Sequence, residues 1–336
     1  MKGTHLLILL VAVVLAAGTA VHLTLQKPED IRINQTVLGD FADKLPSLTR
    51  IEVSSATGTV MDARIDDGNW WAVNLGEDAV LPLDTALLSS LVDSLRTAQL
   101  IEGKTRKAEN YSRLGVQDID INGSSSLQLT LYASDTSFSI IVGNVASSGQ
   151  GSYVRLPGSA QSWLASEVLS LPSSKTEWLT NPLSLMSLND VYQITREGEG
   201  EWLIARDESS LSQSDTNQNL SPLILRDMAD GESLKFATVI DSTLTAMLSN
   251  RFDSVEPYHS QYDTLQALAK ITFVGADDTL SAELFETADG FSVRYQSERK
   301  TWVNDWLFSL SSFSFNQLNK TRQDFLAQAE EMGDVQ

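Results

Sequence analysis

The sequence predicts an α+β protein: a duplicated unit of antiparallel β-hairpins and sheet with one packed amphipathic helix per copy, preceded by a single N-terminal transmembrane helix. Three observations support this prediction. An uncharged apolar stretch lies near the N-terminus, several segments alternate apolar and polar residues, and the order of hairpin, helix and strands recurs in both halves of the chain. Period-two alternation is typical of half-buried strands, and internal repetition indicates a repeated structural unit.

The first predicted element is a membrane span from Leu6 to Leu25, within an anchor of residues 1–27. This stretch carries no formal charge, and a helix of its length covers the roughly 30 Å of a hydrocarbon core. By similarity to signal-anchors, we expect the N-terminus in the cytoplasm and the remaining chain in the periplasm, on the bacterial inner membrane. The alternative is a cleaved signal peptide, processed within residues 16–20.

The composition excludes several classes of function. The chain has 44 Asp and Glu against 24 Lys and Arg, a formal net charge of −20, so we expect no nucleic-acid partner. It has no cysteine, which removes disulfides, thiolate nucleophiles, Cys-ligated metals and the lipid attachment of a bacterial lipoprotein.

Residues 28–48 are expected to form a stalk, and residues 49–185 the first copy of the α+β unit. Hairpin turns favour Asp and Gly, and a helix start favours a capping Asp. The expected elements are a strand over 49–53, a hairpin of 60–65 and 70–74, a helix with apolar positions over 87–95 capped by Asp84, a hairpin of 127–132 and 137–142, and a strand over 151–155.

The second copy is expected over residues 186–320, with an inserted loop over 207–232. A polar tail that is helical in part is expected over residues 321–336. Its elements are strands over 191–195, 202–205, 269–274, 281–286 and 291–295, and a helix whose apolar face contains Phe236, Val239, Ile240, Leu244, Met247 and Leu248. Three pairs of positions match between the copies: Gly68-Asn69-Trp70 with Gly200-Glu201-Trp202, Val154-Arg155 with Val293-Arg294, and Trp163 with Trp302. The alternative is a chance similarity of two hairpins.

The first copy also contains a set of residues that resembles a known family. They are Trp70-Trp71, the helix over 87–95, Tyr111-x-x-x-Gly115, Ile141-Val142-Gly143, Gly151-Ser152-Tyr153-Val154-Arg155 and Trp178-Leu179. On these residues the chain resembles the domain of unknown function 4340 over residues 49–300. The resemblance implies a membrane-anchored protein, often encoded beside ABC transport systems of the gliding-motility type, and implies no catalytic residue.

Candidate site residues are few. Tyr153 with Arg155, and Arg294 with Tyr295, place an aromatic ring and a guanidinium in each copy, which suits a carboxylate, a sugar or a partner strand. The alternative is that these arginines pair with surface acids. Acidic pairs such as Asp277-Asp278 are expected to serve turns, and we expect no catalytic residue, no metal site and no cofactor.

The leading functional hypothesis is therefore a non-enzymatic, membrane-anchored periplasmic accessory subunit that docks on an ABC-type permease or its associated subunits. The alternative is a periplasmic module that binds a glycan or small solute at the interface of the two copies. Hydrolysis is a third hypothesis, for which the sequence contains no recognisable nucleophile motif such as G-x-S-x-G.

Overall fold

The structure is a computed structural model that describes residues 34–76, 79–207 and 221–328. The predicted span from Leu6 to Leu25 therefore lies outside the described residues, as do residues 28–33 of the predicted stalk and 329–336 of the predicted tail. Within the described ranges, no helix is both long and apolar enough to cross a membrane.

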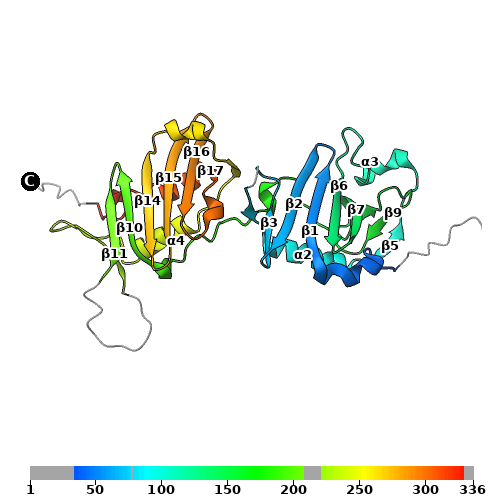
Figure 1. Cartoon of the computed structure of the whole chain (residues 1–336), viewed down its shortest axis with the longest axis horizontal. Coiled ribbons are helices and arrows are strands. Elements are labelled where there is room, and N and C mark those ends of the chain that lie inside the picture. The colour runs from blue at the N-terminus through cyan, green and yellow to red at the C-terminus, as the bar shows by residue number, and fades with distance from the viewer. Residues whose placement is uncertain (1–33, 77–78, 208–220, 329–336) are drawn as a thin grey trace, which may run out of the picture. The chain divides into compact units, whose positions relative to one another are not determined.

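The first sheet has nine strands in the order β4-β3-β2-β1-β6-β7-β8-β9-β5 (Figure 1). Both predicted hairpins of the first copy are confirmed: β2 and β3 flank a turn at Asp67, and β6 and β7 flank a turn at Ser134, each with positive φ. The strands are β1 Leu48–Ser55, β2 Gly58–Asp66, β3 Asn69–Ala72, β4 Leu81–Pro82, β5 Leu100–Gly103, β6 Leu127–Ala133, β7 Thr136–Val145, β8 Ser152–Arg155 and β9 Ser162–Ala165.

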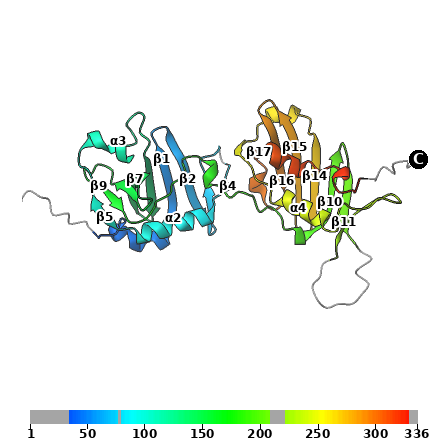
Figure 2. The same cartoon turned by 180° about the vertical axis from the view of Figure 1, so that it is seen from behind.

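Helix α2 (Thr85–Thr97) lies across one face of the first sheet, as Figure 2 shows from behind. It buries Leu88, Leu91 and Leu95 at three- and four-residue spacing, as its sequence predicts. The Asp84 carboxylate accepts the N–H groups of residues 86 and 87 at 2.9 and 3.0 Å, so the predicted cap is confirmed. A short helix, α3 (Tyr111–Leu114), follows β5.

The second sheet has eight strands in the order β12-β11-β10-β14-β15-β16-β17-β13. Its strands pair antiparallel, with long ladders between β10 and β14 and between β15 and β16. The bounds are β10 Val191–Gly198, β11 Trp202–Arg206, β12 Leu223–Leu225, β13 Ser254–Pro257, β14 Ala269–Gly275, β15 Thr279–Thr287, β16 Gly290–Ser297 and β17 Trp306–Leu310. The prediction of one inserted loop over 207–232 is wrong for residues 223–225, which form β12.

Helix α4 (Val239–Leu248) lies across one face of the second sheet (Figure 2), and α5 (Ser312–Leu318) packs beside it. The predicted apolar face of α4 is confirmed for residues 239, 240, 244 and 247, which are buried. Phe236 is an exception: it precedes the helix and is 54% exposed. The residue before Phe236 is bonded outside the helix: Lys235 donates its backbone N–H to the carbonyl of Phe325.

Beyond α5 the chain returns to the second sheet. Residues Arg322–Asp324 form one 3-10 turn, and the following Phe325 is fully buried with its ring 5.3 Å from that of Trp202. The first part of the predicted polar tail therefore contributes to the core.

The two sheets share one strand order. Without β4, the first sheet reads β3-β2-β1-β6-β7-β8-β9-β5, which matches β12-β11-β10-β14-β15-β16-β17-β13 strand for strand. The order along the chain also matches, since α2 and α4 each lie between the third strand of their series and the far-edge strand, β5 or β13. This correspondence identifies equivalent positions in the two sheets.

Only one of the three sequence matches agrees with this correspondence. Val154 and Val293 lie on the equivalent strands β8 and β16. Trp163 pairs with Val154, but the partner of Val293 is Phe308, so the match of Trp163 with Trp302 is wrong. The match of Trp70 with Trp202 is also wrong, because the turns that precede them join β2 to β3 and β10 to β11, which are not equivalent pairs.

Candidate functional site

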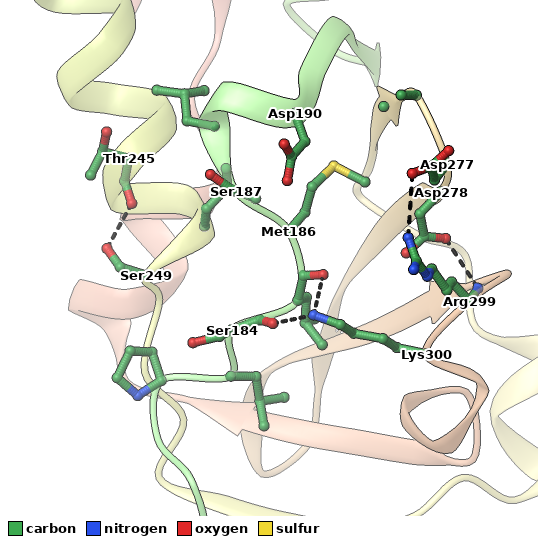
Figure 3. A pocket seen from close by; sticks show the side chains of 17 residues that line it. Ser184, Met186, Ser187, Asp190, Thr245, Ser249, Asp277, Asp278, Arg299 and Lys300 are labelled. Carbon is green, nitrogen blue, oxygen red and sulfur yellow. Dashed lines mark hydrogen bonds and ion pairs between the residues drawn. The ribbon is translucent and has the colours of Figure 1, made fainter.

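A groove of about 640 Å³ lies on the second sheet (Figure 3). Four segments line it: the extended chain over 182–187 with the 3-10 turn Leu188–Asp190, the end of α4, the turn between β14 and β15, and the turn after β16. Figure 3 shows Thr245 of α4 and Ser249 just after it on one side, and Arg299 with Asp277 and Asp278 on the other. All of these segments lie between residues 182 and 300.

The chain over 182–187 forms a strap along the groove. Leu183 and Leu185 are buried, whereas Ser184 between them is exposed, so the strap inserts alternate side chains into the core. The ammonium of Lys300 fastens the strap, since it donates hydrogen bonds to the carbonyl oxygens of Ser184 and Leu185. Burial lowers the pKa of Lys300, and Arg299 lowers it further, while Asp278 acts in the opposite direction.

Asp278 holds the opposite wall of the groove together. Its carboxylate accepts hydrogen bonds from the Ser297 hydroxyl at 2.8 Å and from the N–H groups of Glu298 and Arg299 at 3.1 Å. Asp277 is 3.5 Å from Arg299, and both side chains are mostly exposed. These contacts agree with the prediction that the pair Asp277-Asp278 serves a turn.

Sequence reasoning did not find this groove. Lys300 and Ser184 are 116 residues apart, and neither lies in a local pattern that indicates their contact. A lysine just beyond a strand and a serine in an irregular segment are ordinary surface residues by sequence.

Of the predicted contact residues in the first sheet, Arg155 is buried, with 2% of its surface exposed. Its Nε donates to the carbonyl of Val116 at 2.8 Å, Nη1 to that of Ser159 at 2.9 Å, and Nη2 to the carboxylate of Asp118 at 2.6 Å. Tyr153, two residues earlier on the same face, is half-buried, and the ammonium of Lys104 lies 5.8 Å from its ring centroid.

Some of the residues that carry the family resemblance lie around Arg155. Its guanidinium lies 4.5 Å from the ring centroid of Tyr111, which packs with Val116 and Ile141 in a small buried cluster. Gly115 ends α3 with φ +68. A Cβ on Gly143 would lie 2.3 Å from the carbonyl oxygen of residue 114, so only glycine allows this close approach. The motif thus builds a support for one buried arginine.

In the second sheet the predicted pair is divided between two faces, because Arg294 and Tyr295 are adjacent on β16. Tyr295 faces the core, 8% exposed, with its ring 5.7 Å from that of Phe308, and burial raises its pKa. Arg294 lies on the opposite face and is half-buried, with its guanidinium 3.6 Å from the ring centroid of Tyr258. The structure therefore brings Arg294 next to Tyr258 rather than to Tyr295.

The other charged groups of the described residues do not gather into a metal centre. No three His, Cys, Asp or Glu side chains within 34–76, 79–207 and 221–328 are arranged to hold an ion. His259 begins a 3-10 turn over Ser260–Thr264, and its ring lies 6.5 Å from that of Tyr262.

Fold and site together define a protein of two antiparallel sheets, each with a helix across one face and with a buried or half-buried arginine on the third strand from one edge. The chain belongs to the family described as domain of unknown function (DUF4340), whose model matches residues 70–275. No curated protein and no solved structure matches the chain.

Proposed function

We propose that this protein is a non-enzymatic, membrane-anchored accessory subunit of an ABC-type transport complex, with its two sheets acting as docking domains in the periplasm. The uncharged stretch from Leu6 to Leu25 would hold it in the inner membrane with the N-terminus in the cytoplasm. The sheets would then contact the permease or an associated subunit on the periplasmic side.

The observation that carries this proposal is the use made of charged groups in the groove. Lys300 holds the strap, and Asp278 accepts three hydrogen bonds from the turn beside it. A catalytic acid, base or nucleophile needs free atoms directed at a substrate. Lys300 and Asp278 are engaged in holding loops instead, which favours a scaffold over an enzyme.

We also propose that the two sheets arose by duplication. The matching strand order supports this, because eight strands and one helix follow the same path in both series. Repeated units that differ in their surfaces suit a protein that bridges two partners, since each copy offers the same frame with different contacts.

Copurification tests the docking role. The full-length protein, tagged at its C-terminus and extracted in mild detergent, should bring down subunits of an ABC-type transporter. A chain in which residues 1–27 are replaced by an unrelated single-span anchor should retain them if the sheets do the docking. Absence of any transporter subunit from the wild-type preparation would contradict the proposal, and loss on anchor exchange would transfer the docking to the membrane segment.

The groove supports a second candidate function, binding of a small solute or a glycan. Its volume of about 640 Å³ falls in the usual range of small-molecule sites, and its lining mixes apolar side chains with carboxylates and cations. Thermal unfolding across a panel of cell-envelope solutes tests it, because a specific ligand must raise the melting temperature. Lys300→Met is the matched variant: a rise that persists unchanged in it would place the ligand outside the groove.

A further inference from the structure

Arg155 and Arg294 occupy equivalent positions in the two sheets. Each follows the valine that the strand correspondence aligns, and each extends from the face opposite to that valine. Each guanidinium also lies over a tyrosine ring, with distances to the centroid of 4.5 Å for Tyr111 and 3.6 Å for Tyr258. Both tyrosines come from the connection that follows the far-edge strand: Tyr111 begins α3 after β5, and Tyr258 comes directly after β13.

The N–H groups of a guanidinium form a fork of hydrogen-bond donors, and the two arginines differ in the acceptors that this fork has. In the first sheet, three nitrogens of Arg155 have acceptors at 2.6 to 2.9 Å, two of them main-chain carbonyls and the third the carboxylate of Asp118. These acceptors come from the segment after Tyr111 and from the β8–β9 loop. In the first sheet, therefore, the fork of the stacked arginine is bound to protein acceptors.

In the second sheet, the fork of Arg294 has no hydrogen-bond acceptor among the side chains and backbone that the structure describes. Its Nε is buried and without a partner. The neighbouring carboxylates have other donors. Glu283, directly across from Arg294, accepts a hydrogen bond from Lys270 at 3.1 Å, and Asp263 accepts one from the hydroxyl of Tyr258 at 3.0 Å.

The Nε–H group of Arg294 has lost water without gaining a protein acceptor. A buried N–H without a partner costs free energy, whereas a charge-assisted bond to a carboxylate returns more than a neutral bond does. In a chain with a net charge of −20, a guanidinium without a carboxylate partner is unusual. Stacking on Tyr258 orients the fork before a ligand arrives, which lowers the entropy cost of binding.

We propose that the fork of Arg294 on Tyr258 binds an acidic peptide segment of a partner protein, which supplies a carboxylate and main-chain carbonyls as residues 116–118 and 159 do for Arg155. The first sheet determines this ligand class, because its occupied fork uses that combination of acceptors. The ring of Tyr262, 5.6 Å from that of Tyr258, extends the surface with the Tyr and Arg composition of interface hot spots. The proposal rests on the docking role proposed above and assigns its contact surface.

A titration of the full-length protein in detergent tests the proposal. The probe is a capped synthetic peptide with the sequence of residues 114–119, Leu-Gly-Val-Gln-Asp-Ile, which contains one acid. The control peptide carries Asp118→Asn. In ¹H–¹⁵N spectra of the arginine Nε–Hε groups, the signal of Arg294 should shift in a saturable way with the acidic peptide, and the amide peptide should bind about tenfold more weakly. The signal of Arg155, whose fork is occupied, should stay in place.

Variants distinguish recognition by the guanidinium of Arg294 from a general effect of positive charge. Arg294→Met and Arg294→Lys should each weaken the acidic peptide by about tenfold or more, because neither keeps a bidentate fork. Arg251→Met removes an exposed arginine near β13 and should leave the affinity unchanged. Equal binding by Arg294→Met and wild type, or an Arg294 signal that moves with neither peptide, would overturn the proposal.

The copurification assay distinguishes this inference from the docking role itself. If transporter subunits follow the wild type and are lost with Arg294→Met but not with Arg251→Met, both proposals are supported. If they follow Arg294→Met as well, docking uses another surface and only this inference fails. If no transporter subunit copurifies with either wild type or Arg294→Met, the docking role fails. The peptide titration then still decides whether the fork of Arg294 binds a carboxylate.

Discussion

The guanidinium of Arg155 lies over the ring of Tyr111 and donates its Nε hydrogen to the carbonyl of Val116 at 2.8 Å. One side chain thus joins β8 to α3 through a ring contact and to the segment after α3 through a hydrogen bond. The contact is buried, so the carbonyls that Arg155 satisfies have no ready replacement from water.

We predict that Arg155 is structural and that Arg294 is not. Arg155→Met should lower the free energy of unfolding by about 3 kcal/mol, because it leaves the carbonyl of Val116 unpaired and removes the partner of Asp118. Arg294→Met should cost about 1 kcal/mol or less, the typical value of a partly exposed cation–π contact. Urea unfolding of both variants measures the difference. Equal losses would show that the two arginines play the same role.

The cap of α2 gives a second prediction. Asp84→Ala should destabilise the protein by about 1 kcal/mol, because the N–H groups of Ala86 and Leu87 lose their acceptor. Asp84→Asn keeps an acceptor oxygen at the same place and should cost only a few tenths of that value. Chemical denaturation of both variants provides the comparison. A loss with Asn as large as with Ala would mean that the negative charge, not the cap, is what matters.

Local patterns predicted those elements whose residues are close in sequence. Helix α2 has its apolar period and its cap within residues 84–97, and the hairpins β2–β3 and β6–β7 have their turn residues between the strands. The short edge strands were not predicted. β5 forms because Leu100 lies beside Ala165 on β9, a contact that no window around residue 100 contains.

The site was predictable only in part, for the same reason. Arg294 was identified by its resemblance to Arg155, and that position is confirmed as equivalent. Tyr258 was not identified, because its ring reaches Arg294 through a connection whose path depends on β13 and β14 being placed first. Tyr295 was misassigned because a sequence pattern shows which residues are adjacent but not which face of an irregularly flanked strand is covered.

Tyr295 supplies a prediction at alkaline pH. Burial raises its pKa in the folded protein above the value of a free tyrosine, so the folded state keeps the phenol protonated where the unfolded chain ionises. The stabilisation is present below about pH 10 and declines as pH rises further. Tyr295→Phe should therefore flatten the fall in stability above pH 10, as followed by urea unfolding. Tyr192→Phe, at a side chain 49% exposed, is the control and should keep the wild-type slope.

Lys300 should make the free energy of unfolding change with pH in the opposite direction to Tyr295, and at a lower pH. Burial lowers its pKa in the folded protein, with a further contribution from Arg299, so between that value and the ordinary lysine value the unfolded chain binds more protons than the folded one. Stability therefore rises with pH across this interval, because the folded state is relieved of a partly buried charge. The hydrogen bonds to Ser184 and Leu185 do not reverse this sign, since a neutral amine also donates to carbonyls.

In urea unfolding at alkaline pH below about 10, before the tyrosines ionise, the free energy of unfolding of wild type should rise with pH relative to that of Lys300→Met. Lys235→Met removes an exposed lysine from the same half of the chain and should follow wild type. At neutral pH, Lys300→Met should also free the strap, which hydrogen exchange at residues 183–187 would detect as faster exchange. A strap that exchanges at the wild-type rate, together with an unchanged pH dependence of stability, would show that Lys300 neither fastens the strap nor carries a partly desolvated charge.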